Sequence, residues 1–410
     1  MAYSFSFWTT IILIAVMMGV IQGTCAYLVF VERKLAAYVQ DRVGPNRVGP
    51  FGLFQPIADG LKFIFKEEII PVQVDKLFYL IAPAIAASTA LLAFAVVPFG
   101  PTNAPPERVW PQTMEQEAKA DPVFDENVKK YNEAEIRFVI APHVDIGIVF
   151  VFAVTSLSVY GIILGGWSSN NKYSMIGALR SSAQLISYEI PMGMSVLGVV
   201  LMSDSLNPER IIAYQVEAGW NVLYQPLACL LFLVCVLAEC NRLPFDLPEA
   251  EQELVGGYHT EYGAMKFALY FLGEYTHMIT TSFLLVILFL GGWHFPWLQE
   301  SGIAAIMLKL LVIALKMVLL IVFYMLIRWT IPRFRFDQLM GLAWKVLMPL
   351  ALVNLTCVMV VKHLGWSSWW LTASSFVMLL TAAYLTLVQR LPRSGRPLRP
   401  SAESAMALTR

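Results

Sequence analysis

The chain has 410 residues, of which 58% are hydrophobic and only 14% are charged, and its mean hydropathy is +0.63. Soluble domains carry about 45–50% apolar and about 25% charged residues, so this composition excludes a soluble globule and a disordered chain. The 29 basic and 29 acidic residues cancel, which excludes the polycationic surface that binds nucleic acid. We predict an all-α polytopic membrane protein.

Nine apolar segments are candidate membrane spans. A helix needs about 20 apolar residues to cross the hydrocarbon core of a bilayer, which is about 30 Å thick. Segment 183–203 opens with polar residues and contains Pro191, and segment 278–293 is short. We treat residues 1–390 as a single membrane domain. Its predicted spans lie near 9–31, 77–99, 145–166, 183–203, 222–239, 278–293, 305–328, 344–363 and 369–388.

The basic residues predict the orientation of these spans. Lys and Arg are concentrated in the loops after the odd-numbered spans, and such loops stay on the cytoplasmic side. We therefore expect the N-terminus outside and the C-terminus inside. Loop 100–144 then faces outside and the tail 391–410 faces inside. Both are rich in Pro and charged residues, so we expect a solvated insertion and a flexible tail. The basic loop residues include Arg33, Lys34, Arg42, Arg47, Lys62, Lys66, Lys76, Lys172, Arg180, Arg242, Lys266, Arg333 and Arg335.

The first span lacks the charge order of a signal peptide. No Lys or Arg precedes it, and Glu32-Arg33-Lys34 follow it directly, whereas a signal peptide carries its basic residues first. We therefore expect this segment to remain in the membrane as the first span.

The sequence shows no motif for a bound cofactor. No G-x-G-x-x-G follows a strand, and there is no Walker-type glycine loop. The five histidines are not paired within one span at a spacing suited to haem, and the five cysteines form no C-x-x-C pair. We therefore expect no metal, redox centre or nucleotide in this chain, so a partner must deliver any electrons.

The first inside-facing stretch predicts a shaped turn followed by an amphipathic helix. Arg-Val-Gly-Pro occurs twice, at 42–45 and 47–50, and its Pro and Gly residues favour a defined turn. Leu53, Ile57, Leu61, Ile64 and Phe65 then recur at helical spacing, with Asp59, Lys62 and Lys66 on the other face. This pattern is typical of a helix in the membrane interface. The alternative is a basic loop that only sets the topology.

A second inside-facing stretch, 238–254, is unusually acidic. Arg242 is the only base among Glu239, Asp246, Glu249, Glu251 and Glu253. Clustered carboxylates raise one another's proton affinity, as a proton relay requires. The alternative is an acidic helix start that Asp246 and Glu249 cap.

Further ionisable residues lie at or inside the spans. Glu189 lies within the fourth span, Glu261 and Glu274 flank an aromatic segment, and Lys316 is midway along the seventh span. Ionisable residues at membrane depth are costly and therefore functional candidates. We expect Lys316 to pair with an acid from another span and place it on the same proton path. Gly161-x-x-x-Gly165 permits close helix contact.

These stretches resemble the H-type family of quinone-site membrane subunits of respiratory NADH:quinone oxidoreductase (complex I), the counterpart of the mitochondrially encoded subunit 1. The resemblance covers nearly the whole chain apart from loop 100–144 and the tail. Loop 100–144 is longer than in compact members, and short members lack the ninth span. The matching segments are Glu32-Arg33-Lys34 and residues 41–62, 166–189, 238–275 and 332–345.

The resemblance implies a role for each candidate residue. Family members hold no redox centre and form the membrane end of the quinone chamber. By this resemblance the entrance or chamber is lined by Arg33, Gln40, Arg42 and Asp59, with Arg242 and Phe245 deeper. The polar path into the membrane arm contains Glu189, Asp246, Glu249, Glu251, Glu253, Glu261 and Glu274, and Arg333, Arg335 and Asp337 lie on an inside loop.

The resemblance also implies partners and a location. Quinone is the substrate, while NADH, FMN and the iron–sulfur clusters belong to partner subunits. The partners are hydrophilic-arm subunits, which carry the terminal cluster and the quinone headgroup site, and small membrane subunits of the proton-pumping arm. We expect a bacterial cell inner membrane rather than a mitochondrial one.

Two other functions stay open at this point. The acids and Lys316 also suit a stand-alone cation/proton antiporter, although no internal repeat links the two halves of the chain. A membrane subunit of an energy-converting hydrogenase would keep the acids without needing a quinone pocket.

Overall fold

The computed structural model describes residues 7–102, 138–141, 144–246, 255–296 and 303–390. In these ranges the regular elements are all helices, which confirms the predicted fold class. They are α1 (Phe7–Val39), η1 (Pro50–Gly52), α2 (Gln55–Phe65), α3 (Lys76–Leu92), η2 (Ala93–Ala95), α6 (Gly147–Ser168), α7 (Lys172–Ser203), α8 (Pro208–Ala218) and α9 (Asn221–Tyr224). They continue with α10 (Pro226–Glu239), η3 (Gly257–His259), α12 (Ala264–Phe289), α13 (Ile303–Thr330), α14 (Phe336–Leu342), η4 (Ala343–Leu347), α15 (Met348–His363) and α16 (Trp369–Arg390).

Seven of the described helical segments are long and apolar enough to cross a membrane. They are α1, α3 with η2, α6, α7, α12, α13 and the continuous run from α14 to α15. The apolar helix α10 and the apolar stretch Trp369–Tyr384 of α16 are shorter, with 10–17 residues each. Each of the nine predicted segments overlaps one of these nine helical segments.

Two helices begin well before the segments that hydropathy marks. We expected spans from 183 and from 278, but α7 begins at Lys172 and α12 at Ala264. The turns ahead of those segments contain polar side chains that are buried in the protein, such as Ser174, Ser181 and Lys266. A polar residue that protein neighbours cover carries no penalty from lipid, so hydropathy underestimates such helices.

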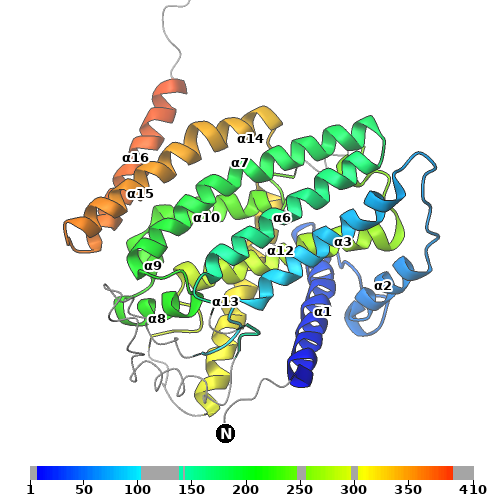
Figure 1. The fold of residues 1–410 in the computed structure, drawn as a ribbon, viewed down its shortest axis with the longest axis horizontal. Helices are drawn as coiled ribbons and strands as arrows, with labels where there is room; N and C mark the ends of the chain where they lie inside the picture. Colours follow the sequence, from blue (N-terminus) through cyan, green and yellow to red (C-terminus); the bar gives the residue numbers. More distant parts are fainter. Residues whose placement is uncertain (1–6, 103–137, 142–143, 247–254, 297–302, 391–410) are drawn as a thin grey trace, which may run out of the picture.

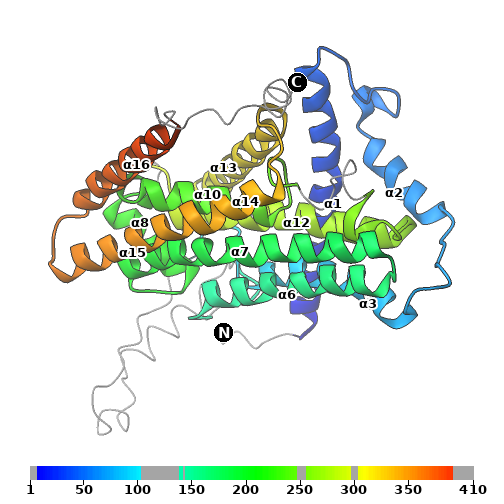
Figure 2. The ribbon, with the colours of Figure 1, turned by 90° about the horizontal axis from the view of Figure 1, so that it is seen from above.

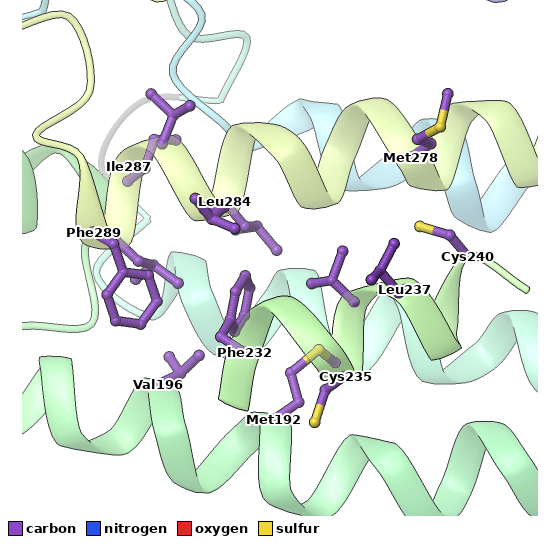
Figure 3. Packing of buried hydrophobic residues seen from close by; sticks show 14 of the residues in the cluster. Met192, Val196, Phe232, Cys235, Leu237, Cys240, Met278, Leu284, Ile287 and Phe289 are labelled. Carbon is purple, nitrogen blue, oxygen red and sulfur yellow. The ribbon is translucent and has the colours of Figure 1, made fainter. Parts of the chain in front are cut away.

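The short helix α10 lies in the centre of the main hydrophobic core. At 14 residues it is about 21 Å long, which is less than the bilayer core. Figure 3 shows its Phe232 and Leu237 between α12, which contributes Leu284, and α7, which contributes Met192 and Val196. Protein contacts on several sides therefore stabilise α10, and it holds the chain that follows it deep in the molecule.

Helices α3, α6 and α7 pack side by side, and α12 packs against α3 and α10 (Figure 1). Gly161 of α6 brings that helix against α3, since a Cβ there would meet the Ala82 carbonyl oxygen at 3.0 Å. Figure 2 shows α1 and α2 together at one end of the molecule and the α15–α16 hairpin at the other.

The stretch after α1 has the predicted turn and helix. Gly44 and Gly49 have φ of 68° and 73°, values that favour glycine. The predicted amphipathic helix is α2, and its apolar residues Ile57, Leu61 and Ile64 are exposed. An exposed apolar face beside α1 fits a position in the membrane interface.

Candidate functional site

Four segments bring their polar groups together around Glu32 of α1. Arg242 donates from Nη1 to both carboxylate oxygens of Glu32, at 3.0 and 3.1 Å. The Tyr275 hydroxyl of α12 donates to Glu32 Oε2 at 2.5 Å, and Arg328 of α13 forms a further ion pair with Oε1. We call these four residues the Glu32 cluster.

The Glu32 cluster is largely buried and carries a net positive charge. Glu32 is 5% exposed and Arg242 8%. Burial alone lowers the pKa of Arg242, but Tyr275 and Glu32 beside it raise the pKa above its ordinary value. The guanidinium also lies 4.3 Å from the centre of the Tyr275 ring, a favourable cation–π contact. With Glu32 ionised, two arginines face one carboxylate, so the cluster attracts negative charge.

A cavity of about 510 Å³ adjoins the Glu32 cluster, and we call it the charged cavity. Three arginines and one glutamate contribute to its walls, together with the turn after α1. Its lining residues are Val29, Glu32, Arg33, Ala36, Arg42, Gly44, Pro45, Phe271, Tyr275, Arg328 and Trp329.

A second cavity of about 450 Å³ lies between α1, α2 and α12, and we call it the apolar cavity. It shares Val29, Arg33, Phe271 and Tyr275 with the charged cavity, so the two spaces adjoin. Most of its other lining residues are apolar or small: Cys25, Ala26, Phe30, Pro56, Gly60, Phe63, Met265, Phe267, Ala268, Leu269 and Leu272.

An exposed ion pair stands at the junction of the two cavities. Arg33 Nη1 donates to Asp59 Oδ2 at 2.7 Å, and Gln55 of α2 donates to Asp59 Oδ1 at 3.0 Å. Asp59 lines the apolar cavity, and Arg33 lines both. This ion pair therefore links α2 to α1 at the place where the two cavities meet.

The other predicted chamber residues lie at different depths. Arg42 lines the charged cavity, and Arg242 contacts Glu32 at its edge. Gln40 is exposed at the end of α1 and lines neither cavity. Phe245 is buried in the main core, with ring-centre distances of 5.3 Å to Tyr188 and 5.7 Å to Phe334. Its backbone N–H donates to the Arg242 carbonyl oxygen at 2.8 Å, so the buried Phe245 side chain holds the turn that contains Arg242 in place.

Two small polar cavities extend from the end of α10 into the membrane-spanning region. One, of about 20 Å³, is lined by Glu189 of α7 and Glu239 of α10. The other, of about 30 Å³, is lined by Glu239, Glu274 and His277. Ser156 donates a hydrogen bond to Glu189, and Tyr258 donates to Glu274 at 3.3 Å. Glu239 lines both cavities and therefore connects them. We call Glu189, Glu239 and Glu274, together with the two cavities that they line, the acid chain.

The remaining predicted acids lie elsewhere. Asp246 forms an ion pair with Arg333 at 3.1 Å. Glu261 accepts a hydrogen bond from Asn171 at 2.7 Å, at the start of α7. Glu249, Glu251 and Glu253 lie outside the described residues, as do most of loop 100–144 and the whole tail 391–410.

The expected acid partner of Lys316 is a wrong prediction for the described part of the chain. The ammonium group donates to the carbonyl oxygens of Leu290, Gly292 and His294, at 2.6, 2.9 and 2.8 Å. It also lies 4.6 Å from the ring centre of Trp220. These carbonyls belong to the turn after α12, where a helix end attracts positive charge. Lys316 is therefore separate from the acid chain.

Sequence reasoning missed several residues of these sites. Glu32 is adjacent to Arg33 and Lys34, so in the sequence it looks like part of the charged segment that ends the first span. Arg328 lies in the last turn of α13 and Glu239 is the last residue of α10, so an ion at the end of an apolar helix is an available signal. Glu239 was counted in the acidic stretch 238–254 but not among the residues of the proton path. Tyr275 and His277 have no distinctive signal within their aromatic segment. Among the described residues, no group of three His, Cys, Asp or Glu side chains is placed to hold a metal.

The chain was compared with known protein families and with curated relatives. The model of a family described as NADH dehydrogenase matches residues 11–359. The chain belongs to this family. The H subunit of NADH-quinone oxidoreductase from Leptospira biflexa is 47% identical over 79% of the chain and 86% of its own length. An H subunit of the same enzyme from Geobacter metallireducens is 45% identical over 83% of the chain and 93% of its own length. One from Cytophaga hutchinsonii is 43% identical over 80% and 89%.

Membership of this family confirms the predicted resemblance. It makes this chain a membrane subunit of a multisubunit oxidoreductase and favours that function over a stand-alone antiporter or a hydrogenase subunit. The family match ends at residue 359, before α16 begins at Trp369.

Proposed function

We propose that this chain forms the membrane wall of a quinone chamber and couples quinone reduction to proton translocation. The observation that carries the proposal is the pair of adjoining cavities, one charged and one apolar. A quinone has a polar headgroup on a long isoprenoid tail, so it needs an apolar space that opens into a polar one.

The geometry gives each cavity a part in binding. The apolar cavity between α1, α2 and α12 accepts the tail from the membrane interface, where α2 lies. The Arg33–Asp59 pair at the junction offers hydrogen bonds to a passing headgroup. Beyond it, the Glu32 cluster favours the negative charge that develops on a quinone as electrons arrive. The electrons come from iron–sulfur clusters in partner subunits. Those subunits also hold the NADH and FMN sites.

The acid chain provides the coupling. A new charge at the Glu32 cluster changes the proton affinity of neighbouring carboxyl groups, since like and unlike charges shift it in opposite directions. Arg242 follows α10 by three residues, and Glu239 is the last residue of α10, so the cluster and the acid chain share one segment. A change in the charge of Glu239 then changes the proton affinity of Glu189 and Glu274. Asp246, Glu249, Glu251, Glu253 and Glu261 are further candidates for this path, whereas the carbonyl contacts of Lys316 remove it from the proposal.

The proposal includes a location and partners. We place the chain in a bacterial inner membrane, with the N-terminus outside. The charged cavity then faces inward, toward hydrophilic-arm subunits that complete the chamber around the quinone headgroup. Small membrane subunits of the pumping arm receive the protons.

Replacing Asp59 by Asn tests the chamber. An exposed ion pair contributes about 0–1 kcal/mol to stability, so assembly should persist. We expect kcat/KM for quinone to fall about tenfold, since the charge at the junction is lost. Electron transfer from NADH to an artificial hydrophilic acceptor should be unchanged.

Asp204→Asn is the matched control for this test. Asp204 forms an exposed ion pair with Lys362 but lines neither cavity, so this variant should keep the wild-type rate with quinone. If Asp59→Asn lowered both activities in proportion, a defect in assembly would explain the loss and the chamber proposal would lose its support.

A further inference from the structure

His277 lines the cavity of the acid chain that Glu239 and Glu274 also line. On α12, Tyr270, Gly273, Glu274 and His277 follow one another at helical spacing and line the same cavity. Glu239 of α10 lines that cavity as well. The imidazole therefore shares a polar cavity with the two carboxyl groups through which we route protons.

The bonding of His277 calls for a partner that the described residues do not supply. The side chain is 8% exposed, and its Nδ1 atom has no hydrogen-bond partner among the described residues. A buried polar atom without a partner costs free energy, so native structures satisfy it with protein groups or with water. The cavity of about 30 Å³ has room for a water molecule, which needs about 10–15 Å³.

The chemistry of imidazole suits this place better than a third carboxyl group. A neutral imidazole accepts a proton on one nitrogen and releases one from the other, so it passes a proton on without keeping a charge. A third carboxylate beside Glu239 and Glu274 would add repulsion in a buried site.

We propose that His277 relays protons between Glu239 and Glu274 through water in their shared cavity. This inference rests on the proposed function, because it adds a residue to the same path. The proton moves from one carboxyl group through water to one imidazole nitrogen, and the other nitrogen releases a proton toward the second carboxylate. No electron is transferred in this step.

The test compares His277→Gln with His277→Leu in the assembled complex. Gln keeps hydrogen-bonding groups but does not carry a proton, so a purely structural role would be rescued by Gln and a relay would not. We expect kcat for coupled quinone reduction to fall about 100-fold in both variants, while the KM for quinone stays within about twofold. The rate with an artificial hydrophilic acceptor should stay normal, and it reports assembly.

Two further variants separate this inference from the proposed function. His363→Gln at the exposed end of α15 should leave every rate unchanged. Glu239→Gln should reduce coupled turnover. If Glu239→Gln impaired turnover and His277→Gln did not, the relay role of His277 would be overturned while the acid chain stood. If neither impaired turnover, the acid chain itself would be refuted.

Discussion

At the scale of single residues, Glu32 decides the electrostatics of the charged cavity. Its partners Arg242 and Arg328 lie 210 and 296 residues away in sequence, and no local pattern could reveal either contact. The family resemblance placed Arg33, Arg42 and Asp59 at the chamber, and the basic turn and the amphipathic helix that contain Arg42 and Asp59 were visible as local features of the sequence. The acids in apolar segments, Glu189 and Glu274, were equally visible.

The Glu32 cluster should be sensitive to the loss of its only carboxylate. Glu32→Gln leaves two cations close together, one of them buried, and we expect a loss of about 3 kcal/mol in stability. Arg328→Met should cost less, since 28% of the Arg328 side chain is exposed and Arg242 still neutralises Glu32. A thermal-shift assay on the purified complex measures both variants. Equal losses in the two would mean that burial does not govern the cluster.

At the scale of helices, two lysines fasten the C-terminal ends of neighbouring helices. Lys316 of α13 binds the turn after α12, and Lys362 of α15 binds the Leu201 carbonyl oxygen and Asp204 at the end of α7. Cations at helix C-termini are favourable because they face unpaired carbonyl oxygens and the negative end of the dipole. Hydropathy predicted that these helices exist, yet it misplaced the starts of α7 and α12, because neighbouring helices cover their polar turns.

Lys316→Met should loosen α12 at its C-terminal end. Three carbonyl oxygens lose a charged donor in a half-buried site, so we expect a loss of about 2 kcal/mol. Lys362→Met should cost less than about 1 kcal/mol, because Lys362 is exposed and its bond to Asp204 is a surface ion pair. Hydrogen exchange of residues 284–290 and thermal unfolding measure the two effects. A larger loss in Lys362→Met would contradict this interpretation.

At the scale of the whole molecule, the sequence predicted the membrane class, the helical segments and the family. It did not predict how the helices surround space. The adjoining cavities depend on the meeting of α1 and α2 with α12, which is distant from both in sequence, and on the exposed placement of α2 beside α1. The main core likewise depends on α10, which we predicted as an ordinary span over 222–239 but which is a helix of only 14 residues packed between α7 and α12.

The predicted orientation can be tested at the two ends of α6. Asp145 and Asn170 flank this helix and are both exposed. Single cysteines there should react with a membrane-impermeant maleimide from opposite sides of sealed vesicles, position 145 from outside and position 170 from inside. The background should lack Cys229 and Cys357, the two partly exposed native cysteines. Labelling in detergent verifies that both sites are accessible, and labelling from one side only would refute the topology.

The central claim is that the two adjoining cavities hold one quinone, with its tail in the apolar cavity and its headgroup toward the Glu32 cluster. A quinone with a photoreactive group on its tail tests this most directly, when it is crosslinked in the assembled complex and the labelled peptides are identified by mass spectrometry. The account predicts tail labels within residues 22–30, 56–63 and 265–272, which competing quinone removes. Labels confined to α15 and α16, at the opposite end of the molecule, would contradict it.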